Sequence, residues 1–391
     1  MDSETIRRFG RRLRFGMVGG GEGSIIGETH ILALRVDGFG ELVAGSLSSR
    51  PSVALASAAR HLIDPERAYT DFRVMAKQES LRSDPIDAVI IATPPESHLE
   101  VAAAFLENGI DVVCEKPITS DVEEAKQLAR SVSQSGRLFC LTHCYTGYPM
   151  VRQARAMVAA GAIGRVCIIE VEFCPGDPGT ALEPDDPSKR HWRFKVGSMG
   201  KAAILGEVGS HAYHIATYVS GLRAERVSAT LRTFAKRREV YDNAYLTVEF
   251  TQGAQGRLWS SYVASGNDQG LRFRIFGESG SLAWCQEDPE YLVHKQIGAP
   301  ATVLARGYRS LGQASRNATR FRAGFPEGYG LAFANLYTDF AKALIARKLG
   351  LPYVGYLDEL PTVDDGLEGM RMIEAAARSH NECGSWMSMP T

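Results

Sequence analysis

Short apolar runs alternate with stretches of helical periodicity through the first 142 residues, and this alternation restricts the possible folds more than any other feature. The apolar runs predict strands at 14–18, 41–47, 88–92, 111–114 and 138–142. Strands separated by amphipathic helices form a parallel sheet with right-handed crossovers and helices on both faces. We therefore expect residues 1–142 to form a doubly wound α/β domain of the Rossmann type.

The pattern changes after about Thr142 to longer alternating segments separated by turn signals such as Gly253 and Gly266-Asn267. This alternating pattern with regular turn signals is typical of antiparallel strands. A helix is predicted over 150–160, and strands are predicted at 167–173, 226–234, 244–250, 256–264 and 271–276. Helices predicted over 329–348 and 363–380 would cover one face of the sheet. Residues 143–391 are thus expected to form an α+β domain with a large open, mainly antiparallel sheet.

The charge balance argues against two classes of partner. The formal net charge is -1 and no stretch is apolar enough to span a membrane, so we expect neither a nucleic-acid nor a membrane partner. Two arginine pairs, Arg7-Arg8 and Arg11-Arg12, precede an apolar stretch that is too short for an export signal, so a cytoplasmic location is expected. The seven cysteines include no pair with zinc-type spacing, which predicts reduced thiols and no metal site.

Glycines crowd the turn between the first predicted strand and the next helix, at Gly19, Gly20, Gly21, Gly23 and Gly27. Glycines here permit a tight turn and close approach of a pyrophosphate, which the following helix N-terminus stabilises. Compared with the usual dinucleotide fingerprint, residues 22–24 are an insertion, and the helix is expected to begin near Glu28. A plain glycine-rich turn is the alternative interpretation.

The second predicted strand lacks the carboxylate that usually accepts the adenosine ribose hydroxyls of NAD. It ends instead in Ser48-Ser49-Arg50. Hydroxyls beside an arginine can accept a 2′-phosphate, so the sequence predicts NAD and leaves NADP open. A solvated turn is an equally simple interpretation of these three residues.

Several motifs are spread along nearly the whole chain: IATPPESH at 91–98, CEKP at 114–117, YTGYP at 145–149, Trp192-Arg193, GEVGSHA at 206–212, PEGY at 326–329 and PTVDDG at 361–366. Together these motifs resemble the glucose-fructose oxidoreductase / inositol dehydrogenase / MocA family. The resemblance implies an NAD(P)-dependent oxidoreductase. The cofactor contacts expected from it are Gly19, Gly21, Ile26, Gly27, Ser48, Ser49, Arg50, Thr93, Pro94, His98, Glu115 and Lys116.

The Glu-Lys-Pro motif is the most specific of these marks. It puts Lys116 at the carboxyl end of a predicted parallel strand, beside the nicotinamide that the resemblance implies. An ammonium group there can stabilise developing alkoxide charge as hydride leaves the substrate. The resemblance also implies a cis peptide bond between Lys116 and Pro117. A solvated surface lysine is the alternative.

Family members carry an aspartate four residues before a histidine, and the corresponding pair here is Glu207 and His211. At this spacing both side chains would share one helix face, so that the carboxylate orients the imidazole or contacts substrate. An unperturbed histidine titrates at about 6.5, which suits proton transfer near neutral pH. A purely structural histidine is the alternative.

Two departures from the family pattern bear on the substrate: Glu207 replaces aspartate, and His214 stands where Asp or Asn is usual. Basic side chains crowd the segment before the catalytic helix: Lys189, Arg190, His191, Arg193, Lys195 and Lys201. They would suit an anionic sugar, although charge runs more often form solvated faces. The expected substrate contacts are Tyr145, Trp192, Arg193, Lys201 and His214.

The resemblance implies hydride transfer to or from a secondary alcohol of a sugar, anhydrosugar or cyclitol. Lys116 and His211 would take part in transfer of the substrate hydroxyl proton, and Glu207 and Tyr145 are further catalytic candidates. An alternative is an NAD-dependent glycosidase, which oxidises a glycoside transiently, eliminates the aglycone, adds water and reduces the ring again. A non-enzymatic nucleotide sensor is the third hypothesis. The open sheet and the resemblance together predict a homodimer or homotetramer.

Overall fold

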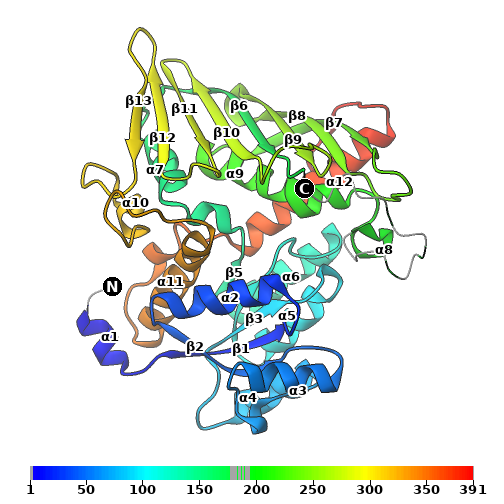
Figure 1. Cartoon of the computed structure of the whole chain (residues 1–391), viewed down its shortest axis with the longest axis vertical. Helices are drawn as coiled ribbons and strands as arrows, with labels where there is room; N and C mark the ends of the chain where they lie inside the picture. The colour runs from blue at the N-terminus through cyan, green and yellow to red at the C-terminus, as the bar shows by residue number, and fades with distance from the viewer. Residues whose placement is uncertain (1–2, 177–182, 184–185, 187–188, 190–193, 391) are drawn as a thin grey trace. The chain divides into compact units, whose positions relative to one another are not determined.

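The computed structural model describes residues 3–176, 183, 186, 189 and 194–390. The chain divides into two compact units (Figure 1). The first unit comprises residues 1–119, 123–147 and 329–367, and the second comprises 120–122, 148–328 and 368–391. Among the described residues, no helix combines the length and the apolar character needed to cross a membrane.

The first unit contains the predicted parallel sheet of five strands, in the order β2-β1-β3-β4-β5. The strands are β1 (Leu13–Gly19), β2 (Gly40–Ser46), β3 (Ala88–Ala92), β4 (Asp111–Cys114) and β5 (Phe139–Leu141). Every residue of β3 and β4 is buried, as expected for central strands covered on both faces. The Rossmann-type fold expected from the alternating pattern is confirmed.

Helix α1 (Ser3–Phe9) precedes β1. The helices between the strands are α2 (Ile25–Val36), α3 (Pro51–Arg60), α4 (Phe72–Leu81), α5 (His98–Glu107) and α6 (Val122–Ser135). Helix α2 begins at Ile25, three residues earlier than expected, because the Ser24 hydroxyl caps it by accepting a hydrogen bond from Gly27 N at 3.2 Å. Residues 22–24 therefore belong to the turn and the cap.

Helix α11 (Tyr329–Lys348) packs against α2 in the first unit. The expectation that it covers the second sheet was wrong. Its aromatic residues Tyr337 and Phe340 lie 6.1 and 6.3 Å, ring centre to ring centre, from Phe15 in β1. Because α11 is buried around most of its circumference, its sequence shows no single apolar stripe that would identify its partner.

The second unit is built on a nine-stranded sheet in the order β13-β12-β11-β10-β6-β9-β8-β7-β14. Its strands are β6 (Val166–Phe173), β7 (Ala224–Arg232), β8 (Asn243–Phe250), β9 (Gln255–Ser261), β10 (Leu271–Gly277), β11 (Gly280–Cys285), β12 (Tyr291–Gln296), β13 (Thr302–Ala305) and β14 (Met387–Ser388). Among the strand pairs of the described residues, the central pair β6 and β9 alone is parallel. The mainly antiparallel sheet is confirmed, although β11 to β14 were not predicted.

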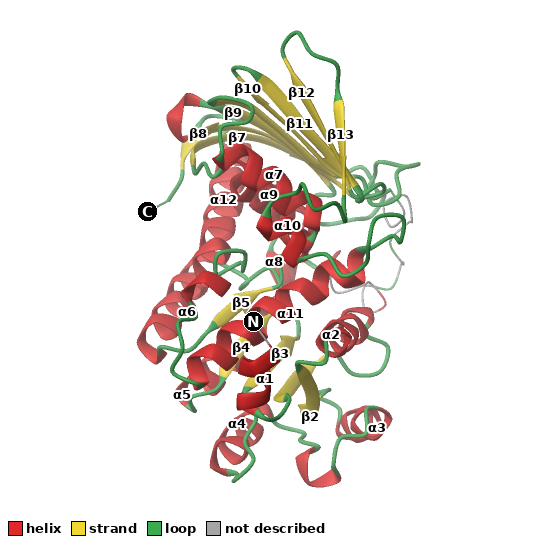
Figure 2. Cartoon of the chain, turned by 90° about the vertical axis from the view of Figure 1, so that its left-hand side faces the viewer, coloured by secondary structure: helices red, strands yellow, loops and turns green. Residues whose placement is uncertain are grey.

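Helices cover one face of this sheet and leave the other open (Figure 2). Helices α7 (Pro149–Ala159) and α9 (Ser210–Ser220) contact the covered face. Shorter helices α8 (Val196–Met199) and α10 (Gln313–Asn317) belong to the same unit, and α12 (Val363–Asn381) starts in the first unit and ends in the second. The strands therefore alternate between core residues and solvent-facing ones, which matches the predicted open sheet.

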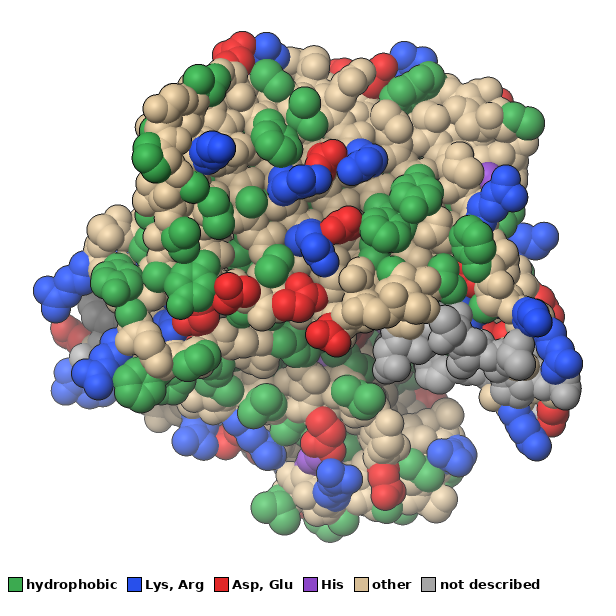
Figure 3. Space-filling model, turned by 45° about the horizontal axis from the view of Figure 1, so that its top comes forward, with side chains coloured by type: hydrophobic (Ala, Val, Ile, Leu, Met, Phe, Trp, Pro, Cys, Tyr) green, Lys and Arg blue, Asp and Glu red, His purple; other side chains and the backbone are tan. Residues whose placement is uncertain are grey.

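The open face combines charged pairs with apolar side chains. Glu170 forms ion pairs with Arg257 and Arg274 across neighbouring strands. Exposed apolar residues lie on both sides of this ladder, at Ile168, Tyr245, Val293 and Val303 among others. Figure 3 shows this arrangement, with charged side chains near the middle of the face and hydrophobic ones around them.

Candidate functional site

The glycine-rich turn joins β1 to α2 in a conformation that larger residues would not permit. Gly19 and Gly20 have φ angles of +77° and +69°, which side chains rarely adopt. A Cβ atom on Gly27 would come within 2.0 Å of the Gly20 carbonyl oxygen. The helix N-terminus and the turn thus pack backbone against backbone, which fits the pyrophosphate cradle of a dinucleotide site.

The end of β2 lies beside this turn. Gly21 N donates a hydrogen bond to Leu47 O at 3.0 Å, which brings the chain entering Ser48-Ser49-Arg50 close to the glycines. Ser49 and Arg50 are exposed, and Arg50 N donates to the Ser48 hydroxyl at 3.1 Å. Hydroxyls and a guanidinium therefore stand where many relatives of this fold carry a ribose-binding carboxylate.

His98, an expected cofactor contact, is enclosed in the first unit with no exposed surface. Its Nε2 lies 2.8 Å from Thr93 O, and its Nδ1 lies 3.0 Å from Pro117 O. Burial lowers the pKa of His98 despite these carbonyl contacts. The ring joins the turn after β3 to the Glu-Lys-Pro turn, so it supports these two turns from inside the core.

The Glu-Lys-Pro turn follows β4, and the Lys116–Pro117 peptide bond is cis, as the resemblance implied. Glu115 is buried, and it accepts hydrogen bonds from the Thr142 hydroxyl and, at 3.3 Å, from Lys116 N. Sequence reasoning missed Thr142 and also His30, whose Nε2 lies 3.2 Å from Glu115 Oε1. The one signal available was a histidine on the apolar face of the cofactor helix.

Tyr145 lies in a single 3-10 turn, Cys144–Gly147, that follows β5. Its ring centre is 6.2 Å from that of Tyr329, the first residue of α11. A Cβ on Gly147 would meet Ala332 O at 1.9 Å, and Asn335 Nδ2 donates to Gly147 O at 2.8 Å. Helix α11 therefore fixes the turn that carries Tyr145.

In the second unit, Glu207 and His211 belong to two successive helical segments. Glu207 lies in a π-helical turn, Leu205–Gly209, and His211 lies in the first turn of α9. Both side chains are buried, and the His211 ring centre is 5.9 Å from that of Phe173. The regular helix expected around this pair is thus interrupted by a π turn, a feature frequent at functional sites.

Tyr262 supports Glu207 and was not predicted. Its hydroxyl donates to Glu207 Oε2 at 3.4 Å, and its ring meets Phe194 edge-on with 5.8 Å between centres. The guanidinium of Arg238 lies 4.0 Å above the Phe194 ring and donates to Glu183 Oε1 at 2.8 Å. A chain of contacts, buried at every residue except the half-buried Phe194, therefore runs from Glu183 to the catalytic candidate Glu207.

The remaining substrate candidates divide into two groups. His214 is buried in α9 with its ring centre 5.9 Å from that of Tyr218, and Lys201 is exposed just before the π turn. Trp192 and Arg193, together with Arg190 and His191, lie outside the described residues.

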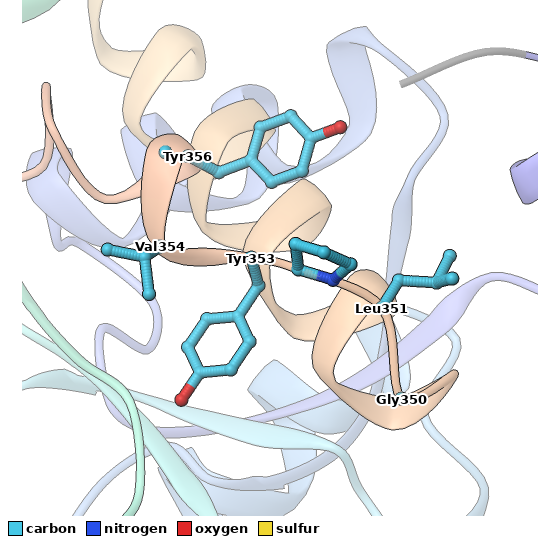
Figure 4. Close-up of a pocket in the computed structure, with 7 residues that line it drawn as sticks. Gly350, Leu351, Tyr353, Val354 and Tyr356 are labelled. Atoms are coloured by element: carbon cyan, nitrogen blue, oxygen red, sulfur yellow. The ribbon is translucent and has the colours of Figure 1, made fainter.

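Two surface hollows have none of the predicted site residues in their linings. One is lined by residues 350–356, between α11 and α12 (Figure 4). Its tyrosines, Tyr353 and Tyr356, point in different directions from the loop, and its lining contains no carboxylate, amine or imidazole. The other lies among α4, α5 and α6 and combines Arg73 and Lys77 with Glu100 and Glu107. Neither hollow is lined by the glycine turn, the Glu-Lys-Pro turn or the Glu207–His211 pair.

Comparison with known proteins agrees with the motifs. The model of the oxidoreductase family with an NAD-binding Rossmann fold (GFO_IDH_MocA) matches residues 13–143, and the GFO/IDH/MocA C-terminal domain model matches residues 151–283. An uncharacterized oxidoreductase of Bacillus subtilis (strain 168), YfiI, is 30% identical over 97% of this chain and 98% of its own. A levoglucosan dehydrogenase of Pseudarthrobacter phenanthrenivorans is 28% identical over 71% of this chain and 74% of its own.

Among solved structures, an inositol dehydrogenase homolog of Azotobacter vinelandii is 34% identical in sequence. The match covers 97% of this chain and 98% of the homolog's chain. Its complex with NAD+ superposes with a TM-score of 0.92, and its complex with NADH and myo-inositol with 0.89. The similarity extends through both units of the present chain.

Proposed function

Because this chain belongs to the GFO/IDH/MocA family of NAD-binding oxidoreductases, we propose that it transfers a hydride reversibly between NAD and a secondary alcohol of a sugar, anhydrosugar or cyclitol. The first unit is an NAD-binding Rossmann fold. The glycine turn and the N-terminus of α2 would hold the pyrophosphate. The turn after β3, with Thr93 and Pro94, would border the nicotinamide, which accepts or supplies the hydride.

The Glu115-Lys116-Pro117 turn at the end of β4 is the observation that carries this proposal. It puts an amine at the carboxyl edge of the sheet that also carries the glycine turn, and active sites of open α/β sheets lie at this edge. In the proposed reaction, Lys116 donates a hydrogen bond to the reacting hydroxyl and stabilises its alkoxide character. Lys116 also belongs to the expected cofactor contacts.

His211 is proposed as the group that takes the hydroxyl proton during oxidation and returns it during reduction. Glu207, four residues before it, would orient the ring or contact a substrate hydroxyl. The π turn and the contact from Tyr262 support a precise placement of Glu207. Tyr145, His214, Trp192 and Arg193 complete the proposed substrate contacts.

The relatives support a polyhydroxylated substrate. One is a levoglucosan dehydrogenase, and another is an inositol dehydrogenase homolog whose structure contains myo-inositol. Both compounds carry several secondary alcohols on a ring. Exposed Lys201 near the π turn favours testing anionic sugars beside neutral ones.

We further propose that the open sheet of the second unit pairs with a second copy of the chain, giving a homodimer or homotetramer. Val293 and Val303 lie side by side in register on β12 and β13, and both are exposed. Contiguous exposed apolar surface beside complementary charges is typical of subunit interfaces.

The experiment is an assay of purified protein with NAD and, separately, NADP against a panel of neutral and anionic sugars, anhydrosugars and cyclitols. NADH absorbance follows oxidation, and a parallel panel of glycosides with chromogenic aglycones follows bond cleavage. Substrate-dependent NADH formation without aglycone release is the expected result. Aglycone release without net NADH would instead identify the redox-neutral glycosidase, and activity only with NADP would assign Ser48, Ser49 and Arg50 to a 2′-phosphate.

A further inference from the structure

Three side chains from separate segments of the first unit form a buried cluster, and two of them, His30 and Tyr337, have no role in the proposed reaction so far. His30 comes from α2, Glu115 follows β4 and Tyr337 comes from α11. His30 has no exposed surface, and its Nδ1 lies 2.7 Å from the Tyr337 hydroxyl. Its Nε2 lies 3.2 Å from Glu115 Oε1, an ion-pair distance rather than an aligned hydrogen bond. The cluster joins the cofactor helix to the residue before Lys116.

The Glu115 carboxylate favours the tautomer of His30 that carries hydrogen on Nε2, because an ionised carboxylate can only accept. Burial raises the pKa of Tyr337 well above its usual value, so its hydroxyl keeps its proton. In this tautomer the Tyr337 hydroxyl donates to Nδ1. The edge of the His30 ring is held against Phe333, with 5.0 Å between centres and 85° between planes. The ring thus has one defined orientation.

Glu115 needs such support because it is buried. Burial raises the pKa of this carboxyl, but contact with His30, the charge of Lys116 and the hydroxyl of Thr142 together outweigh burial and hold the pKa below its ordinary value. Loss of one partner would leave the charge of the buried carboxylate without enough stabilising contacts. Such a carboxylate either binds a proton or moves toward other polar groups.

We propose that His30 is a positioning residue for the reaction, which keeps the Glu115 carboxylate ionised and fixed directly behind Lys116 so that the lysine retains its charge and aim. The Lys116 backbone N–H donates to this same carboxylate at 3.3 Å, so a displaced or neutral Glu115 would shift the turn itself. This inference rests on the proposed function for its catalytic consequence, but its first step concerns the protein alone.

The titratable groups around the cluster come from every element that packs against it. They are Glu115, Lys116, His98, Cys114, Cys140, Cys144, Tyr329 and Tyr337. Burial keeps the three thiols and both phenols protonated, since it raises the pKa of each. These thiols and phenols therefore contribute no protonation change near neutral or mildly acidic pH.

The test uses the full chain with His30→Leu, His30→Gln and Tyr337→Phe. Leucine removes the contact, glutamine returns an amide donor toward Glu115, and Tyr337→Phe removes only the hydroxyl that fixes the ring. Thr338→Val is the matched control, because the Thr338 hydroxyl donates to Asp37 in the contact between α11 and α2 without reaching Glu115. Circular dichroism and thermal melting first establish that each variant is folded.

The first measurement needs no substrate or cofactor. Infrared titration of the protein alone follows the carbonyl stretch of protonated Glu115, assigned by its disappearance in Glu115→Gln. We expect this band at higher pH in His30→Leu than in wild type, by about one pH unit or more, with a smaller change in Tyr337→Phe and partial return in His30→Gln. An unshifted band in folded His30→Leu, or an equal shift in Thr338→Val, would overturn the proposal.

The second measurement is turnover on the best substrate of the panel. His30→Leu should lower kcat about tenfold and move the acidic limb of the pH profile upward, with KM for NAD changed by less than about twofold. A shifted infrared band with wild-type kcat would also overturn the positioning role. If the wild-type protein oxidises none of the alcohols, the proposed function fails separately, and a shifted band would still support the coupling of His30 to Glu115.

Discussion

The Tyr262 hydroxyl donates a hydrogen bond to Oε2 of Glu207 across 3.4 Å, and both side chains are buried. Glu207 lies in the π turn before α9, and Tyr262 directly follows β9. The sheet therefore supplies the partner that orients a carboxylate projecting from a helix. Since 3.4 Å is a long donor–acceptor distance for a hydrogen bond between two oxygens, we expect its contribution to stability to be at the weak end of the range for hydrogen bonds in proteins.

Tyr262→Phe should lower kcat about three- to tenfold, because one modest hydrogen bond to a buried carboxylate is lost while the ring packing on Phe194 is kept. Steady-state kinetics check the effect, and the melting temperature should stay near that of wild type. Tyr245→Phe, on the exposed sheet face, is the control. Unchanged kcat in Tyr262→Phe would mean that Glu207 is held without it.

Lys116→Ala should lower the rate of hydride transfer by a factor on the order of a hundred or more, because the donor to the developing alkoxide is removed. Affinity for NAD should change little. Single-turnover absorbance measures the chemical step, and fluorescence titration measures cofactor binding. Lys126→Ala, on the surface of α6, serves as control. Wild-type chemistry in Lys116→Ala would remove this lysine from the mechanism.

His211→Ala should abolish the neutral-pH limb of the rate profile, because the imidazole proposed as the proton acceptor is removed. Glu207→Asp should be milder, since the carboxylate remains and only its reach changes. The pH dependence of kcat distinguishes these outcomes, with His294→Ala in β12 as control. A wild-type profile without His211 would mean that another group is the base.

How well the sequence predicts this molecule depends on whether a feature is encoded locally. The strand at 88–92 was predicted to the residue, because all five of its residues are buried and apolar. The cofactor turn was also predictable, although the Ser24 cap moves the start of α2 to Ile25. Strands β12 and β13 were missed because their exposed faces carry a mixture of polar and apolar side chains.

The contacts that organise the site are not local. His30 and Tyr337 are 307 residues apart in the chain, and Tyr262 and Glu207 are 55 apart. Sequence motifs identify Lys116 and His211 as candidates, but they contain no information on which distant side chain completes each environment. Likewise, the helix over 329–348 was predicted correctly as a helix, whereas its neighbour α2 follows only from the tertiary fold.

Lys201→Ala should raise KM for an anionic sugar about tenfold or more and leave the neutral analogue nearly unchanged, if the substrate carries the charge that the basic cluster suits. One charge-assisted hydrogen bond is worth roughly 1.5–3 kcal/mol, which covers this change. The neutral analogue is the internal control. Equal KM values for the anionic sugar in wild type and variant would mean that Lys201 lies in a solvated loop and does not contact the substrate. Neutral sugars would then be the expected substrates.

Val293→Asp should convert the proposed oligomer to smaller species, because it buries a carboxylate in the proposed sheet interface beside Val303. Light scattering at micromolar concentration measures the mass. Leu62→Asp is the matched control, since Leu62 is an exposed apolar residue of the first unit. A monomeric wild-type protein would contradict the interface directly.

Helix α11 has a consequence for how the protein is made. The Rossmann unit takes its last segment from residues 329–367, and that segment covers Phe15 in β1 and His30 in α2. The ribosome synthesises β1 and α2 before α11. The aromatic core residues of the nascent nucleotide-binding domain therefore stay uncovered until α11 has been synthesised. The core of this domain can close only after residues 329–367 have been synthesised, because they supply the side chains that cover Phe15 and His30.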